Sequence, residues 1–170
     1  REALLLHAIE GFAEPEIAAA LGLGTVEAGR LVGIAWEELS QAVAGRVMVI
    51  EDETIIAMDI AAIVTGMGHE VTGVARTRSE AESLAARMPP DLVLADIHLA
   101  DGSSGVDAVA AILARLGQRP VIFITAFPER LLTGTRPEPA FVINKPYSEA
   151  QLQSAIGQAM FFASSAVIEG

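Results

Sequence analysis

The chain has 170 residues, 52% of them apolar, and no cysteine, so a packed core is expected while disulfides, thiolate metal ligands and a thiol nucleophile are excluded. Its formal net charge of −11 argues against bulk electrostatic attraction to nucleic acid, because phosphate binding needs basic side chains. The sequence contains no apolar run of about 18 residues and no signal-peptide pattern, so we expect a cytoplasmic protein without membrane contact.

Residues 1–45 predict an all-α segment. Pro15 lies in the first turn of the second predicted helix, where its missing N–H is tolerated, and Gly22 and Gly24 form a turn before the third. Two helices joined by a tight glycine turn have the spacing of a helix-turn-helix. The three predicted helices span residues 2–10, 14–21 and 26–43.

This helical segment resembles region 4 of bacterial sigma factors. In that family the third helix enters the DNA major groove and contacts it through basic residues. Here the third helix offers Arg30 against three glutamates, and residues 1–45 hold 2 basic and 7 acidic residues, a net charge of −5. The segment has the fold signals of a sigma domain without the charge to hold DNA; the alternative is an ordinary helical hairpin. The matching stretches are Arg1-Glu-Ala-Leu-Leu-Leu, Glu10-Gly-Phe, Glu16-Ile-Ala-Ala-Ala-Leu-Gly22 and Gly24-Thr-Val.

After Gly45 the pattern changes, and residues 46–170 predict a second domain in which strands alternate with helices. Such alternation indicates a flavodoxin-like, doubly wound α/β fold, with a five-stranded parallel sheet covered on both faces. Between 128 and 139, three prolines leave room for only a turn or two of helix. Strands are predicted near 47–50, 71–75, 92–95, 121–124 and 140–143, and helices near 54–67, 79–87, 105–116 and 148–162.

Polar side chains follow four of these strands, namely Glu51 with Asp52, then Asp96, Thr125 and Lys145. Ligands of open α/β sheets bind beyond the carboxyl ends of the strands, so we expect these groups to share one pocket. The clustered acids repel each other unless a cation such as Mg²⁺ neutralises them. With the ion bound, Asp96 can attack a phosphoryl group as a carboxylate nucleophile. Lys145 would neutralise the new oxygens, and Thr125 would donate a hydrogen bond to one of them.

Each of these residues also has a purely structural interpretation. The acids after the first strand favour the N-terminus of the next helix, Asp96 suits a turn, Thr125 suits a helix cap and Lys145 suits a loop. Four strand ends that each carry the required chemical group in the required order are much harder to explain by chance. The set therefore favours a functional pocket.

Residues 46–165 resemble a response-regulator receiver domain, through the acid pair after the first strand, Asp96 after the third, Thr125-Ala after the fourth and Lys145-Pro after the fifth. The resemblance implies that Asp52 and Asp96 bind Mg²⁺ directly, with the backbone carbonyl of His98, and that Glu51 contributes through water. It also implies that a histidine kinase or a histidine phosphotransfer protein donates the phosphoryl group to Asp96.

The chain departs from common receivers in its signalling residues. The switch aromatic usually lies three residues before the lysine, where this chain has Val142. Phe141 is one position away, so we assign the switch to Thr125 and Phe141. The usual acid pair is two aspartates, and Glu51 is the longer residue here.

Three stretches depart from common receivers together, namely Ile97-His-Leu-Ala-Asp-Gly-Ser-Ser-Gly105, Thr125-Ala-Phe-Pro-Glu-Arg130 and Lys145-Pro-Tyr147. They resemble the receivers of PhyR-type regulators, in which a sigma-factor-like domain precedes the receiver. The resemblance implies an anti-anti-sigma factor of the general stress response. Phosphorylation would release the sigma-like segment from its intramolecular contact with the receiver, to capture a NepR-type anti-sigma factor. Only the region 4-like half is present, and because the chain begins at Arg1 we expect it to be a piece of a longer protein.

Two other functions stay open. A DNA-binding transcriptional response regulator would need a basic recognition surface. A Mg²⁺-dependent phosphohydrolase with Asp96 as its nucleophile commonly has a second acid two residues later, where this chain has His98. We therefore expect a phosphoacceptor that phosphorylates and dephosphorylates itself, rather than an enzyme with a separate substrate.

Overall fold

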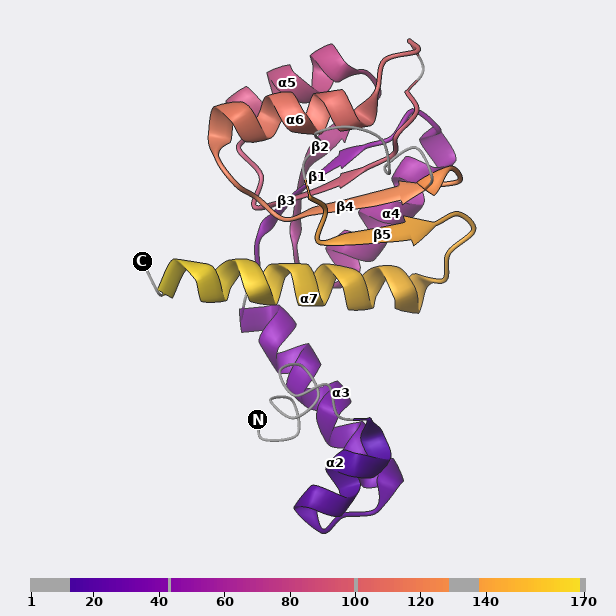
Figure 1. Cartoon of the computed structure of the whole chain (residues 1–170), viewed down its shortest axis with the longest axis vertical. Coiled ribbons are helices and arrows are strands. Elements are labelled where there is room, and N and C mark those ends of the chain that lie inside the picture. Colours follow the sequence, from indigo (N-terminus) through magenta and orange to yellow (C-terminus); the bar gives the residue numbers. More distant parts are fainter. Residues whose placement is uncertain (1–12, 43, 100, 129–137, 169–170) are drawn as a thin grey trace. The chain divides into compact units, whose positions relative to one another are not determined.

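The computed structural model describes four stretches of the chain and divides it into two compact units (Figure 1). We call Arg1–Val43 the helical unit and Ala44–Gly170 the α/β unit. The boundary predicted from the sequence lies two residues further along the chain. The helix predicted at 2–10 and most of the short turn predicted at 128–139 lie outside the described residues. These described residues are 13–42, 44–99, 101–128 and 138–168.

The helical unit contains α2 (Glu14–Leu21) and α3 (Thr25–Ala42). Gly22 ends α2 in the left-handed region at φ 68°, where a glycine has no Cβ to clash. The two helices pack through a small cluster of buried apolar side chains. This cluster consists of Ile17, Ala18, Ala28 and Val32.

No single helix of the described residues is long and apolar enough to cross a membrane. The bent pair Pro15–Leu21 and Thr25–Ile34, with 96° between its members, passes that test by length and composition only.

The α/β unit is built on one parallel sheet with the strand order β2-β1-β3-β4-β5. This is the order of flavodoxin-like folds and confirms the predicted fold class. The inner strands are buried almost throughout, whereas β5 alternates between half-buried and exposed side chains because it lies at an edge. The strands are β1 (Arg46–Ile50), β2 (Glu70–Ala75), β3 (Leu92–Ala95), β4 (Val121–Thr125) and β5 (Phe141–Asn144).

Helices cover both faces of the sheet (Figure 1). The helices α5 and α6 pack together on one face, and α4 and α7 lie on the other. Side-chain caps set two of the helix starts: Thr77 accepts a hydrogen bond from the Glu80 amide, and Ser104 accepts from the amides of Val106 and Asp107. The helices are α4 (Thr54–Gly66), α5 (Arg78–Arg87), α6 (Gly105–Leu116) and α7 (Glu149–Ile168), the last continuing past its predicted end at 162.

The order of the strands reverses between β1 and β3, which are neighbours in the sheet although β2 lies between them in the chain. Ile50 and Ala95 are in register at the ends of these two strands. Glu51 and Asp96, the residues that follow this pair, therefore lie side by side at the carboxyl ends of their strands. This reversal point is where open α/β sheets hold their ligands.

Candidate functional site

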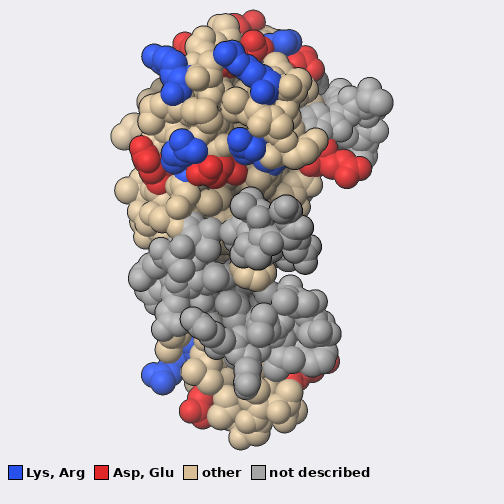
Figure 2. Space-filling model, turned by 90° about the vertical axis from the view of Figure 1, so that its left-hand side faces the viewer, with Lys and Arg blue, Asp and Glu red and all other residues tan. Residues whose placement is uncertain are grey.

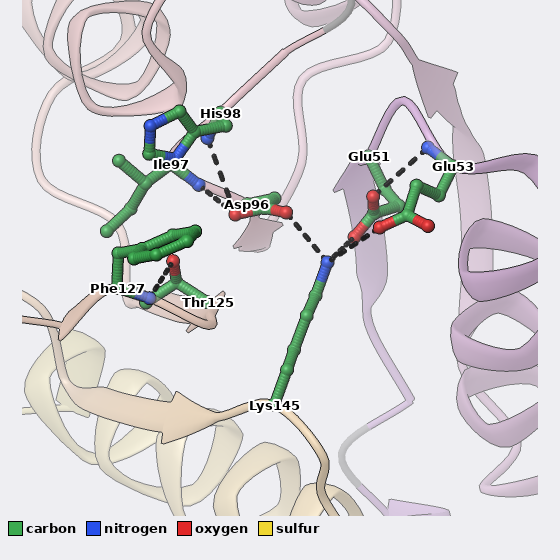
Figure 3. Close-up of polar contacts among 8 residues, drawn as sticks. All are labelled: Glu51, Glu53, Asp96, Ile97, His98, Thr125, Phe127 and Lys145. Atoms are coloured by element: carbon green, nitrogen blue, oxygen red, sulfur yellow. Dashed lines mark hydrogen bonds and ion pairs between the residues drawn. The ribbon is translucent and has the colours of Figure 1, made fainter.

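Lys145 connects the acidic groups at the carboxyl ends of the strands (Figure 3). Its Nζ lies 2.7 Å from Oδ2 of Asp96 and 2.8 Å from Oε2 of Glu51. A third carboxylate, that of Glu53, lies at 3.8 Å. The side chains of Glu51, Asp96 and Lys145 are 1%, 9% and 14% exposed. The structure thus brings one cation and several carboxylates into a largely buried cluster.

Burial and pairing act on the two ends of this ion pair differently. Burial raises the pKa of Glu51, and the hydrogen bond from Lys145 offsets part of that rise. For Lys145, burial favours the neutral amine, but the hydrogen bonds to Asp96 and Glu51 outweigh it and the pKa is raised. Lys145 is therefore held as a cation beside the predicted phosphoacceptor.

Three of the carboxylates are placed to hold a metal ion. Glu51, Asp52 and Asp96 each offer one oxygen, and these three atoms lie within 4.8 Å of one another. An all-oxygen donor set with negative charge suits a hard divalent cation. His98 lies two residues beyond Asp96, and its backbone amide is 3.4 Å from Oδ1 of that residue.

The two predicted switch residues lie at opposite ends of neighbouring strands, Thr125 at the end of β4 and Phe141 at the start of β5. Thr125 ends β4, is fully buried, and its Oγ1 accepts a hydrogen bond from the Phe127 amide at 3.1 Å. Its carbonyl accepts from the Lys145 amide at 2.9 Å. Phe141 begins β5 and is in register with Ile122, three residues before Thr125. The structure thus links Thr125 to the lysine and places Phe141 nearer the other end of its strand.

The loop after Asp96 packs directly against the backbone of that residue. The Gly105 amide donates to the Ile97 carbonyl at 2.8 Å. A Cβ at Gly105 would collide with the Asp96 carbonyl oxygen. Only glycine fits this close approach, and the start of α6 is thereby brought against the predicted phosphoacceptor.

Three features of the site were not predicted. Glu53 approaches Lys145, the rings of His98 and Phe127 meet edge-on with centroids 5.4 Å apart, and Arg76 donates to the Asp52 carbonyl at 3.2 Å. Arg76 directly follows β2. The rule that found the other residues, a polar side chain just past a strand end, would have found it too.

The fold and the site together define a response-regulator receiver. The family model described as "Response regulator receiver domain" matches residues 47–157, and that described as "Response regulator PhyR, sigma-like domain" matches residues 1–42. The chain therefore belongs to the PhyR family of response regulators.

Individual relatives agree with that assignment. The phyllosphere-induced regulator PhyR of Methylorubrum extorquens is 51% identical over 167 residues, which are 98% of this chain and 62% of that protein. The crystal structure of the response regulator PhyR from Brucella abortus has a TM-score of 0.75 and 52% identity, covering 99% of this chain and 69% of that one.

A further solved structure shows a relative bound to a partner. It is the anti-anti-sigma factor PhyR of Bartonella quintana in complex with the anti-sigma factor NepR, with a TM-score of 0.56 and 49% identity, covering 94% of this chain and 65% of that one. The present chain spans about three fifths of the length of the Methylorubrum extorquens protein.

Proposed function

We propose that this chain is the phosphorylation-controlled part of an anti-anti-sigma factor in a general stress response, acting in the cytoplasm. Asp96 accepts a phosphoryl group from a histidine kinase or a phosphotransfer protein. The observation that carries this proposal is the buried cluster in which Lys145 Nζ contacts both Asp96 and Glu51, at 2.7 and 2.8 Å. The remaining activities are self-phosphorylation from small donors and autodephosphorylation.

Each residue of the site has its own role in the phosphoryl transfer. An Asp96 carboxylate oxygen attacks the phosphorus of a phosphohistidine; the new O–P bond forms as the P–N bond breaks, and its electron pair stays on the imidazole. Lys145 neutralises charge on the phosphoryl oxygens, and the Thr125 hydroxyl donates a hydrogen bond to one of them while its oxygen accepts from the Phe127 amide. Mg²⁺, held by Glu51, Asp52, Asp96 and the His98 carbonyl, would supply positive charge to the same oxygens.

Phosphorylation then acts on the helical unit. A phosphoryl group adds about −1.5 to −2 charge at pH 7, and we infer that it favours release of the sigma-like segment through Thr125, because Phe141 begins β5 at the end away from the pocket. The released segment binds a NepR-type anti-sigma factor, the kind of partner seen with the Bartonella protein. The net charge of −5 on residues 1–45 supports a protein partner over the DNA-binding alternative.

Covalent labelling tests the first step. The chain is incubated with acetyl phosphate and Mg²⁺ and analysed by intact-mass spectrometry, with the variants Asp96→Asn and Asp107→Asn. Wild type and Asp107→Asn, which changes an exposed aspartate on α6, should each gain one phosphoryl group, and Asp96→Asn should gain none. Equal labelling of all three would show that Asp96 is not the acceptor.

Calorimetry tests the second step. A NepR-type anti-sigma factor is titrated into a protein extended upstream to the length of its PhyR relatives, with Mg²⁺ and with or without beryllofluoride as an aspartyl-phosphate mimic. Tight binding only with the mimic is the expected result. Equal binding in both states would mean that the receiver does not control the partner, and binding in neither would remove the anti-sigma assignment.

A further inference from the structure

Arg76 reaches from the end of β2 to the loop that carries the acidic residues. Its guanidinium Nε donates a hydrogen bond to the backbone carbonyl of Asp52 at 3.2 Å. Asp52 is one of the three carboxylates placed to hold a metal ion. The contact is thus made to the backbone of a candidate ligand and leaves its carboxylate available.

The backbone from which Arg76 extends is itself held at both ends. Its amide donates to Oε2 of Glu80 at 2.8 Å, while Thr77 Oγ1 accepts from the Glu80 amide at 3.2 Å. On the strand side, the Ala75 carbonyl accepts from the Glu51 amide at 2.9 Å. The backbone of Arg76 is therefore fixed by Glu80, and the loop that its guanidinium contacts is hydrogen-bonded to the end of β2 through Glu51.

We propose that Arg76 is a positioning residue for the divalent cation: it holds the Asp52 backbone so that the Asp52 carboxylate stays with those of Glu51 and Asp96. Without this bond the Asp52 peptide carbonyl loses the donor that orients it. The carboxylate then has to be ordered at the moment the ion binds, which lowers affinity. The inference rests on the proposed function, because it assumes that the acidic cluster binds Mg²⁺.

Whether replacing Arg76 raises or lowers the affinity for Mg²⁺ distinguishes a positioning role from an effect of its charge alone. Arg76 is a cation near an acidic site, so its charge alone weakens Mg²⁺ binding, and removing it would tighten binding. Positioning predicts the opposite, a loss of affinity when the guanidinium is removed. Arg78 serves as a matched control, because its Nε pairs with Glu82 along α5, at 2.6 Å, and not with the acidic loop.

The experiment is a Mg²⁺ titration of the phosphate-free protein, followed by amide chemical shifts in NMR spectra, for wild type, Arg76→Met, Arg76→Lys and Arg78→Met. We expect Arg76→Met to weaken Mg²⁺ binding by roughly 10-fold, the lower end for loss of a partner that orients a ligand. Arg78→Met should bind as wild type or slightly tighter. Arg76→Lys, which keeps the positive charge and the ability to donate hydrogen bonds, should recover part of the loss.

The outcomes distinguish this inference from the proposed function. If wild type binds Mg²⁺ and Arg76→Met binds as tightly as Arg78→Met, or more tightly, the positioning role is wrong and the metal site stands. If wild type itself does not bind Mg²⁺, the proposed metal site fails and the positioning role fails with it. Thermal unfolding without Mg²⁺ checks that each variant is folded at the temperature of the titration.

Discussion

The two ends of the sheet in the α/β unit both carry ion pairs, and these pairs differ in burial and in charge balance. Where the strands begin, Arg46 pairs with Asp91 at 3.3 Å, one cation with one anion, and the two side chains are 45% and 42% exposed. Figure 2 views this side of the unit and shows basic and acidic side chains intermixed. Where the strands end, Lys145 meets Asp96 and the almost fully buried Glu51.

The comparison indicates that burial decides how strongly charged side chains interact at each end of the sheet. Balanced exposed pairs at the first end interact weakly, because water screens them. At the second end, burial prevents water from screening an excess of negative charge, and the pKa values of Glu51 and Lys145 are both raised as a result of burial and pairing. Buried carboxylates in excess destabilise a protein unless a cation neutralises them. Such an excess is therefore expected where a cation binds.

The largest effect is expected from Lys145→Met. Removing this cation leaves Glu51 and Asp96 buried without their shared partner, which should cost about 3 kcal/mol of stability without divalent cations. Hydrogen exchange of the β1 and β3 amides measures that loss. Saturating Mg²⁺ should recover much of it, and so should adding Asp96→Asn to the same chain. A variant as stable as wild type without Mg²⁺ would mean that the cluster does not depend on the lysine.

A pair of glycine substitutions tests the packing at each end. Gly105→Ala forces a Cβ against the Asp96 backbone carbonyl, which cannot move aside, and should cost about 2 kcal/mol. In Gly45→Ala the new Cβ would collide with Cε of Met160, the far end of a flexible side chain, and would meet Asp91 at ordinary contact distance, so the substitution should cost clearly less. Thermal unfolding of both variants ranks them, and the reverse order would contradict the comparison.

The pH dependence of stability tests a buried histidine at the end where the strands begin. His69 is 4% exposed, and its Nδ1 accepts from the Gly45 amide at 3.2 Å, so it must be neutral there. Burial lowers the pKa of His69 below its usual 6.5. The unfolded chain therefore takes up the proton first as the pH falls below 6.5, and the folded state loses stability over that range.

His69→Gln isolates this contribution, because glutamine can accept the same bond but does not titrate. Chemical denaturation at a series of pH values from 7.5 downward should show a shallower loss for His69→Gln than for wild type. Parallel curves for the two proteins would show that His69 does not titrate between the folded and unfolded states.

The smallest effect is expected from Arg46→Met. The Arg46–Asp91 pair is exposed, and the Arg46 amide keeps its own 2.8 Å bond to Asp91 after the side chain is changed. Stability should stay within the error of thermal unfolding, and added salt should not change the difference between variant and wild type. A loss comparable to that of Lys145→Met would mean that burial does not separate the two ends.

Much of the fold could be predicted because its signals are local. Each central strand is a continuous apolar run, as in Val47–Ile50 and Leu92–Ala95, and such runs mark strands buried on both faces. The polar residue that follows each run then falls at the carboxyl end of the sheet. This is why Asp96 and Lys145 could be placed in one cluster although 49 residues separate them in the chain.

Other parts of the site could not be predicted, because they depend on side-chain direction across segments far apart in the sequence. The contact of Arg76 with a backbone carbonyl in the loop after β1 depends on the direction of its side chain after β2. The edge-on contact of His98 with Phe127 depends on how two neighbouring loops close. Nothing in the local sequence distinguishes Gly105 from an ordinary glycine at the start of a helix.

The amino-acid sequence alone therefore determined the order of the elements and which polar residues meet at the carboxyl ends of the strands, because hydrophobic runs and strand-end residues are read along the chain. Only the tertiary structure decided the distances within the pocket, the burial that raises the pKa of Glu51, the hydrogen bonds that raise the pKa of Lys145, and the residues that contact the acidic loop. The physical reason is that burial and pairing arise only when separate strands are brought side by side, and the reversal of strand order between β1 and β3 brings these together.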